Sequence, residues 1–238
     1  MLLFMWSSPR ALSTAFLRMM LERGDFYVVH EPLSNIIVQG YAMVGQNRVT
    51  TSAELVEALL DQARQNPVFV KEVTGYRHDV VNDERLLRLA THTFIIRRLD
   101  AVIASHYVMN PSLTSAEVGY ENQFEIFRLV HEYTGTCPVV VDADALLNDP
   151  PGVVRAYCEK VGIPFLPAAL SWRPGDRQEW SRTREWHRDT AQSAGFYRQR
   201  RNHQVDVHND PTLRAYYHHH LPYYQLLHAK RLIVPPEA

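Results

Sequence analysis

The chain has 238 residues, of which 46% are hydrophobic and 21% charged, a mixture typical of globular proteins rather than of disordered chains. Its formal net charge of −1 excludes a polyanion-binding surface spread over the whole chain, so no nucleic-acid partner is expected and any basic site must be local. The two cysteines, Cys137 and Cys158, form neither a disulfide framework nor a metal-ligand motif, which favours a reducing compartment.

The sequence also bears on location and domain number. No apolar run reaches membrane-spanning length, and the first residues lack the charged leader of a signal peptide. We therefore expect a cytoplasmic protein without a membrane partner. The length suffices for one full hydrophobic core, and no linker, repeat or low-complexity tract divides it, so one domain is expected over residues 1–238.

The first predicted unit is a strand, a tight loop and a helix. An apolar run over residues 1–5 precedes Ser7-Ser-Pro-Arg10, and apolar residues from Leu12 to Met20 recur at helical spacing. A helix N-terminus offers unpaired N–H groups and the positive end of the dipole, and Arg10 adds a fork of donors that suits phosphate or sulfate. The loop predicts an anion site. The alternative is that Ser7 or Ser8 only caps the helix, and the loop alone does not separate the two.

The later elements follow from apolar runs and helix signals. Four more strands are expected at 26–30, 68–70, 93–96 and 138–141. Thr51 with Glu54 forms a capping box that predicts a helix start. Further helices are expected at 83–89, 99–107, 116–133 and 150–161, the last ended by Gly162. Residues 35–49 show no clear period and are expected to be irregular.

Strands that alternate with helices predict an α/β fold of three layers, in which a parallel sheet of about five strands has helices on both faces. Ligands of such sheets bind beyond the carboxyl ends of the strands. Six polar residues follow the predicted strands and are expected to converge there: Arg10, Glu31, Lys71, Glu72, Arg97 and Asp142.

A second motif begins at the end of the fourth predicted strand. Arg97 leaves the strand, and Ser105 lies eight residues later in the following helix. An arginine and a hydroxyl in these places would bind one phosphate from two sides. The alternative is a salt-bridged arginine and a serine that merely packs.

Together the two motifs resemble the bacterial branch of the sulfotransferases that use 3′-phosphoadenosine 5′-phosphosulfate (PAPS), a family with a P-loop-like fold. The resemblance implies a phosphosulfate-binding loop made of Ser8, Pro9, Arg10, Ala11, Leu12, Ser13 and Thr14. It implies that Arg97 and Ser105 bind the 3′-phosphate. Trp172 is then a candidate for the adenine contact, and Arg173 for a remnant of a third phosphate anchor.

The resemblance further implies in-line sulfuryl transfer from PAPS to a hydroxyl or amine of a small-molecule acceptor, with 3′,5′-bisphosphoadenosine (PAP) as the product and no metal. Arg10 would stabilise the charge on the leaving group, and Lys71 would supply a second cation. Glu31 is the first choice for the base, with Glu72 and His78 as rivals. The alternative role of Glu31 is to pair with Arg10 and order the loop.

Departures from the family pattern keep other functions open. Ala11-Leu12 stand where the family has a glycine, which allows a non-catalytic nucleotide-binding relative. A P-loop small-molecule kinase is the other alternative, although the loop lacks the Gly-Lys-Ser/Thr of such enzymes. Residues 172–238 are expected to be mostly helical and to form a lid or the acceptor site, and a homodimer is left open. His187 is expected to be a packed histidine rather than an acceptor-site residue.

Overall fold

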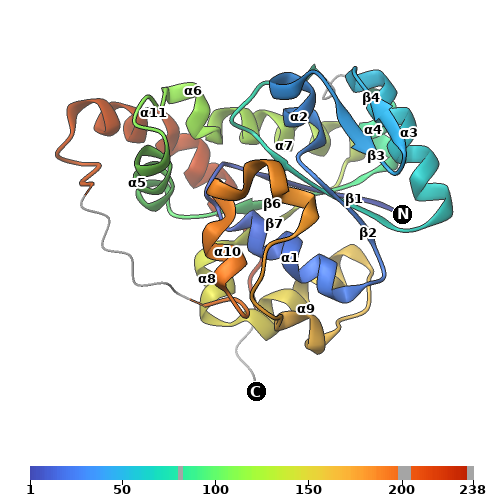
Figure 1. Ribbon diagram of the computed structural model, residues 1–238. Coiled ribbons are helices and arrows are strands. Elements are labelled where there is room, and N and C mark those ends of the chain that lie inside the picture. Colours follow the sequence, from blue (N-terminus) through green and yellow to red (C-terminus); the bar gives the residue numbers. More distant parts are fainter. Residues whose placement is uncertain (80–82, 198–204, 235–238) are drawn as a thin grey trace.

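In the computed structural model, a five-stranded parallel sheet runs through the centre of the molecule (Figure 1). The structure describes residues 1–79, 83–197 and 205–234. The strand order is β2-β5-β1-β6-β7, so β1 lies in the middle. The strands are β1 (Leu2–Ser7), β2 (Tyr27–His30), β5 (Val68–Val73), β6 (Thr91–Ile96) and β7 (Val139–Asp142). The predicted α/β class and the parallel sheet are confirmed.

The central strand β1 is buried on both faces because its alternate side chains serve two separate cores. Phe4 and Trp6 pack on one face, against helices that include α3 (Ser52–Gln65) and α7 (Tyr120–Thr134). Leu3 and Met5 pack on the other face. The helices of the first face also include α4 (Glu84–Leu89), α5 (Leu99–Met109) and α11 (Pro211–His228), and those of the second include α1 (Ser13–Arg23) and α9 (Pro150–Val161).

Two of the predicted helix boundaries have the expected local causes. The Thr51 side chain accepts a hydrogen bond from the backbone N–H of Glu54 and so caps α3. Gly162, in the left-handed conformation, ends α9.

The prediction that residues 35–49 are irregular was wrong. They continue the helix α2 (Pro32–Gln39) and form the hairpin of β3 (Ala42–Val44) and β4 (Asn47–Val49). Pro32 is the first helical residue, where its missing N–H costs nothing, and Gly40 ends the helix. The hairpin strands have three residues each, which is too short for a period of two to show in the sequence.

The predicted helix 116–133 is two helices. Gly119, with φ of +84°, separates α6 (Ser115–Val118) from α7. Its missing Cβ matters, since a Cβ there would lie 3.0 Å from backbone atoms of Thr74. The glycine therefore allows the α6–α7 junction to pack directly on the loop after β5.

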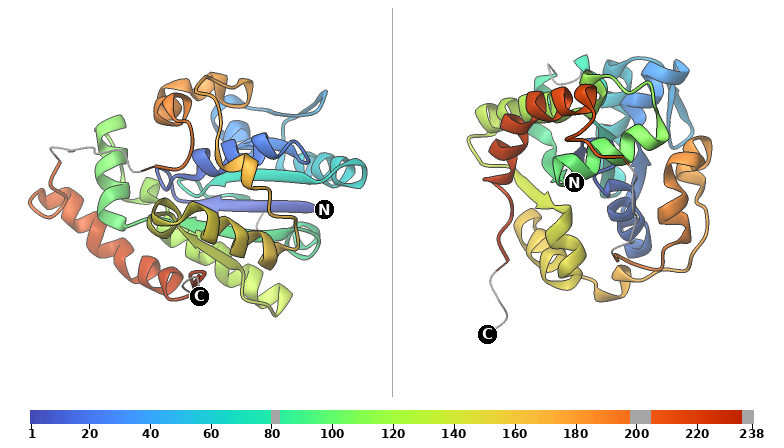
Figure 2. Two further views of the ribbon diagram at one scale, coloured as in Figure 1. Left: turned by 90° about the horizontal axis from the view of Figure 1, so that it is seen from below. Right: turned by 90° about the vertical axis from the view of Figure 1, so that its left-hand side faces the viewer.

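The described part of residues 172–234 is mostly helical. Its helices are η3 (Gln178–His187), α10 (Arg188–Gln192) and α11. Two shorter elements, α8 (Ala143–Asn148) and η2 (Pro167–Leu170), precede it. In Figure 2, α11, drawn in red, lies along α5 and α7, whereas the orange segment of η3 and α10 lies on the side of α1. No helix in the described ranges combines the length and the apolar character needed to cross a membrane.

Candidate active site

A cavity of about 870 Å³ opens at the carboxyl ends of the sheet strands. Four of the six polar residues expected there line it: Arg10, Glu31, Lys71 and Arg97. Glu72 and Asp142 do not. The end of the sheet thus brings together three cations and one carboxylate from four different strands or strand exits, which is the environment of an anionic ligand next to a proton acceptor.

The loop after β1 takes a conformation usually left to glycine. Arg10 and Leu12 have φ of 68° and 72°, and each left-handed non-glycine residue costs roughly 1–2 kcal/mol. Leu12 is the N-cap of α1, and no side chain of the described residues caps that terminus. The first N–H groups of α1, at Ser13 and Thr14, are therefore left for a ligand of the cavity that both residues line. The alternative that Ser7 or Ser8 caps the helix was wrong.

The remaining residues of the predicted phosphosulfate loop divide into two groups. Pro9 lines the cavity with Arg10, Leu12, Ser13 and Thr14. Ser8 and Ala11 are fully buried and lie behind the cavity wall.

The side chain of Arg10 joins the two sequence motifs. Its Nε donates a hydrogen bond to Ser105 Oγ over 3.1 Å, and Arg97 donates from Nη1 to the Arg10 carbonyl over 3.2 Å. Arg10 also donates from Nη1 to the Trp186 carbonyl over 2.5 Å and lies 3.7 Å from Asp189. The predicted loop and the predicted Arg–Ser pair form one polar cluster on one cavity wall.

Arg97 lines the cavity with part of its hydrogen-bonding capacity unused. Its Nε is buried and has no hydrogen-bond partner within the described part of the chain, and no ion pair of Arg97 occurs there. Burial lowers the pKa of Arg97 somewhat, although Asp144 opposes this. The backbone N–H of Arg97 donates to Tyr120 Oη over 3.0 Å, so Tyr120, which the sequence did not suggest, fixes the strand exit. The predicted alternative of a salt-bridged arginine does not hold.

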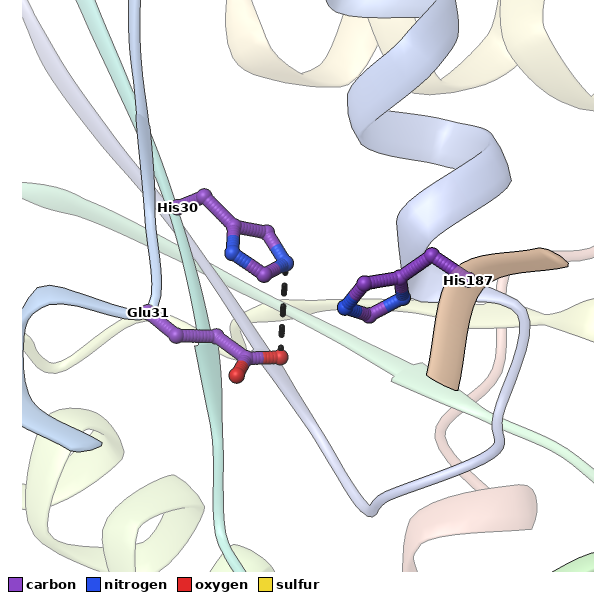
Figure 3. Close-up of side chains that lie close together, drawn as sticks. All are labelled: His30, Glu31 and His187. Carbon is purple, nitrogen blue, oxygen red and sulfur yellow. Dashed lines mark ion pairs between the residues drawn. The ribbon is translucent and has the colours of Figure 1, made fainter. Parts of the chain in front are cut away.

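Glu31 lies at the centre of a second cluster, drawn in Figure 3 with His30 and His187. The buried ammonium of Lys71 donates to Glu31 Oε1, and His30 Nε2 lies 3.5 Å from the same oxygen. His187 approaches from η3 and places its Nδ1 3.1 Å from Thr14 Oγ1. Glu31 thus pairs with Lys71, and its expected alternative partner, Arg10, is engaged elsewhere.

The charge states of this cluster follow from burial and from Lys71. Burial raises the pKa of Glu31, but Lys71 and then His30 lower it more, to about 2, so the carboxyl is ionised at neutral pH. Burial lowers the pKa of His30 to about 4 and that of His187 to about 2. Both imidazoles are therefore neutral at pH 7.

The two rival bases lie outside the cavity. Glu72 is fully buried and accepts hydrogen bonds from the Leu33 N–H over 2.7 Å and the Ser34 hydroxyl over 2.6 Å at the start of α2. Burial raises its pKa. His78 is buried, with its Nε2 2.8 Å from the Val73 carbonyl. These contacts give both residues a structural role.

The predicted adenine contact and third anchor also lie elsewhere. Trp172 is 6% exposed; it donates from Nε1 to Ser193 Oγ over 3.0 Å and packs edge-on against Phe196. The carbonyl of Arg173 accepts from Arg18. Neither residue lines the cavity, whereas Phe196 and Tyr197 do. The residues of this segment that line the cavity are therefore farther along the chain than Trp172 and Arg173.

The sequence placed the segment 183–189 in an expected lid or acceptor region but did not predict its contacts. Thr183, Trp186, His187 and Asp189 line the cavity, and three of them contact Arg10 or Thr14. The segment is a kinked 3₁₀ helix with non-helical φ and ψ at Trp180 and Thr183. Such a segment leaves no period in the sequence, so its contacts with Arg10 and Thr14 could not be predicted.

A model of the sulfotransferase domain family matches residues 1–231. The chain belongs to this sulfotransferase family. Sulfotransferase structures share its fold. The sulfotransferase domain of the Synechococcus PCC 7002 olefin synthase gives a TM-score of 0.52 at 14% identity, over 98% of this chain and 95% of that one. The sulfotransferase from Alicyclobacillus acidocaldarius gives 0.51 at 13% identity, over 79% and 91%.

In two curated relatives, a region similar to this chain is part of a longer protein. The branched-chain-amino-acid aminotransferase-like protein 1 of Arabidopsis thaliana is 27% identical over 202 residues, which are 80% of this chain and 36% of that protein. Protein 2 of the same name is 27% identical over 200 residues. The chain spans about a third of the length of these relatives.

Proposed function

We propose that this sulfotransferase takes the sulfuryl group from PAPS and transfers it to a hydroxyl or amine of a small molecule. The observation that carries the proposal is the buried, unpartnered Nε of Arg97 in the cavity wall. A buried donor without an acceptor costs about 1–3 kcal/mol. A phosphate oxygen of the bound nucleotide would remove that cost.

The arrangement of the two motifs suits one nucleotide with phosphate at both ends. Arg97 and Ser105 would hold the 3′-phosphate from two sides. Ser13 and Thr14, at the uncapped N-terminus of α1, would hold the 5′-phosphosulfate. Because Arg97 contacts Arg10, the two sites share one wall, as a single ligand requires.

The transfer would be in line, with a loose transition state and negative charge growing on the bridging oxygen of the leaving group. Arg10 reaches that region from the loop, and Lys71 from the neighbouring strand β5. A sulfuryl group carries less charge than a phosphoryl group, so these fixed cations suffice without a metal. They would act as preorganised electrostatic stabilisers of the leaving group.

Glu31 would accept the proton of the acceptor. In the structure it is a weak base, since Lys71 holds its pKa low. A sulfuryl oxygen in the cavity would compete for the Lys71 ammonium. Once Lys71 turns to the donor, the pKa of Glu31 rises and the carboxylate becomes a better base. Donor binding would thus activate the base before transfer.

The cavity has room for both substrates. Its volume lies in the upper part of the range of about 300–1,000 Å³ seen for ligand sites. Beyond Glu31, its walls carry neutral polar and aromatic groups from α2, the loop after β5 and η3: Asn35, Gln39, Tyr76 and Trp186. We infer an uncharged or weakly polar acceptor region.

The experiment is to incubate the chain with PAPS and a library of hydroxyl and amine compounds and to detect sulfonated products by mass spectrometry. Sulfonated product that is lost in Glu31→Gln supports the proposal. Phosphorylated product with ATP and Mg²⁺ would favour a kinase instead. Tight PAP binding without turnover of any acceptor would favour a non-catalytic relative.

A further inference from the structure

Three metal-ligating side chains meet beside the proposed sulfuryl site. His30 ends β2, Glu31 is the N-cap of α2, and His187 comes from η3. One ligand atom from each lies within 4.8 Å of the others. Figure 3 shows the two imidazoles and the carboxylate pointing toward a common space.

We propose that His30, Glu31 and His187 form a site for a zinc-like divalent ion, and that such an ion inhibits sulfuryl transfer by occupying Glu31. The inhibitory part rests on the proposed function, whereas the binding part does not. Two histidines and one glutamate are a familiar ligand set for Zn²⁺, with a fourth position left open.

The spacing fits a tetrahedral ion. With metal–ligand distances of about 2.0–2.2 Å, neighbouring ligand atoms lie roughly 3.3–3.5 Å apart. His30 Nε2 and Glu31 Oε1 are 3.5 Å apart. The centres of the two imidazole rings are 4.9 Å apart and the rings are nearly perpendicular. A small rotation of the His187 ring would therefore bring its nitrogen to a ligand distance from the same ion.

The hydrogen bonding of the two histidines leaves a place for the ion. His30 Nε2 is buried and has no hydrogen-bond partner within the described ranges. Among the residues that the structure describes, His187 bonds only hydroxyls, Thr14 Oγ1 at Nδ1 and Thr183 Oγ1 at Nε2, each over 3.1 Å. A hydroxyl turns away at little cost, so an ion can replace one of these contacts without separating His187 from a charged partner.

Lys71 would compete with the ion for Glu31. Its ammonium donates to Glu31 Oε1, the oxygen nearest His30, so the ion and Lys71 compete for one carboxylate. Removing the Lys71 charge should therefore tighten binding of the ion, whereas removing either imidazole should weaken it. Adventitious binding to exposed histidines predicts no effect of Lys71.

The experiment is a titration of the full chain with Co²⁺, followed by its visible absorption, and then displacement by Zn²⁺. We expect one tight ion per chain with the absorption of a four-coordinate site. His30→Ala and His187→Ala should each weaken binding at least about tenfold, and Lys71→Met should tighten it. If an alanine variant does not fold, His30→Gln or His187→Gln replaces it in the same titration. His219→Ala, which removes a surface histidine 3.0 Å from Glu121, is the control and should change nothing.

Unchanged affinity in the His30 and His187 variants, or weaker binding in Lys71→Met, would overturn the site. PAP affinity is measured on the same samples. If the parent chain binds PAP but shows no Co²⁺ site, the metal-site inference is refuted and the proposed function is not. If it binds Co²⁺ at this site but does not bind PAP, the proposed function is refuted and the metal site is not. If PAPS-dependent transfer is found, Zn²⁺ should suppress it and a chelator should restore it; transfer unaffected by a bound ion would refute the inhibitory part.

Discussion

Arg10 Nε donates a hydrogen bond to the hydroxyl of Ser105, 95 residues away in sequence. This contact links the loop that would hold the sulfuryl end of the donor to the pair that would hold its 3′-phosphate. The two ends of the proposed nucleotide site are therefore joined by a hydrogen bond within the protein.

Ser105→Ala tests that hydrogen bond. The variant loses the acceptor of Arg10 Nε and one proposed ligand of the 3′-phosphate, a loss of about 0.5–1.5 kcal/mol, or roughly two- to thirteenfold in PAP affinity. Isothermal calorimetry measures it. Ser112→Ala, at an exposed position beyond α5, is the control. Equal affinity in both variants would mean that Ser105 only packs.

Glu31→Gln separates catalysis from binding. The amide keeps the shape of the side chain but cannot take a proton, so the rate of transfer should fall about 10²–10⁴-fold. PAP affinity should change much less, because Glu31 does not carry the phosphates. Single-turnover kinetics and calorimetry on the same preparation give the two values. If the transfer rate of Glu31→Gln lies within threefold of the rate of the parent chain, Glu31 is not the base.

His92 predicts a dependence of stability on pH away from the site. Burial lowers the pKa of this imidazole from 6.5 to about 4, and Trp6 Nε1 donates to its Nδ1 over 3.0 Å, which requires the neutral ring. A lowered pKa stabilises the fold above pH 6.5, and this contribution is lost as the pH falls toward 4.

The predicted loss of stability at low pH is checked by urea unfolding of the parent chain and of His92→Gln. Since the glutamine does not titrate, the difference in free energy of unfolding between the two proteins should shrink, on the order of 2 kcal/mol, between pH 6.5 and 4. A difference that stays constant over this range would show that His92 does not titrate there.

Gly119→Ala tests the junction between α6 and α7. The added Cβ meets Thr74 backbone at 3.0 Å in a left-handed conformation, whereas in Gly24→Ala, also left-handed, it meets nothing within 4 Å. Both variants pay the conformational cost of about 1 kcal/mol. Only Gly119→Ala should lose about 1–3 kcal/mol more through the clash. Equal losses in denaturant unfolding would contradict the close packing.

The sequence was sufficient for the parts of the fold with strong local signals. Apolar runs marked the five strands, and Thr51 and Gly162 marked helix ends correctly. The hairpin of β3 and β4 was not predictable, because strands of three residues show no alternation. Gly119 was read as an interior residue of a helix, since only the approach to Thr74 reveals its role.

The site residues at the carboxyl ends of the strands were predicted from the sequence. The contacts made by a segment far away in the sequence were not. Arg10, Glu31 and Arg97 each follow a strand and Lys71 lies near the carboxyl end of β5, so the parallel sheet brings them together. Glu72 follows Lys71 directly, but alternation along β5 turns it to the other side, where α2 buries it. His187 arrives on an irregular segment, and nothing in its spacing shows that it contacts Thr14.

The central claim is that one nucleotide with a 3′-phosphate lies between the two arginine motifs, and calorimetry with PAP tests it most directly. The account predicts that PAP binds the parent chain, that Arg97→Ala weakens binding at least about tenfold through loss of a charge-assisted hydrogen bond, and that Arg88→Ala on the exposed side of α4 has no effect. Equal PAP affinity in the parent chain and Arg97→Ala would contradict it.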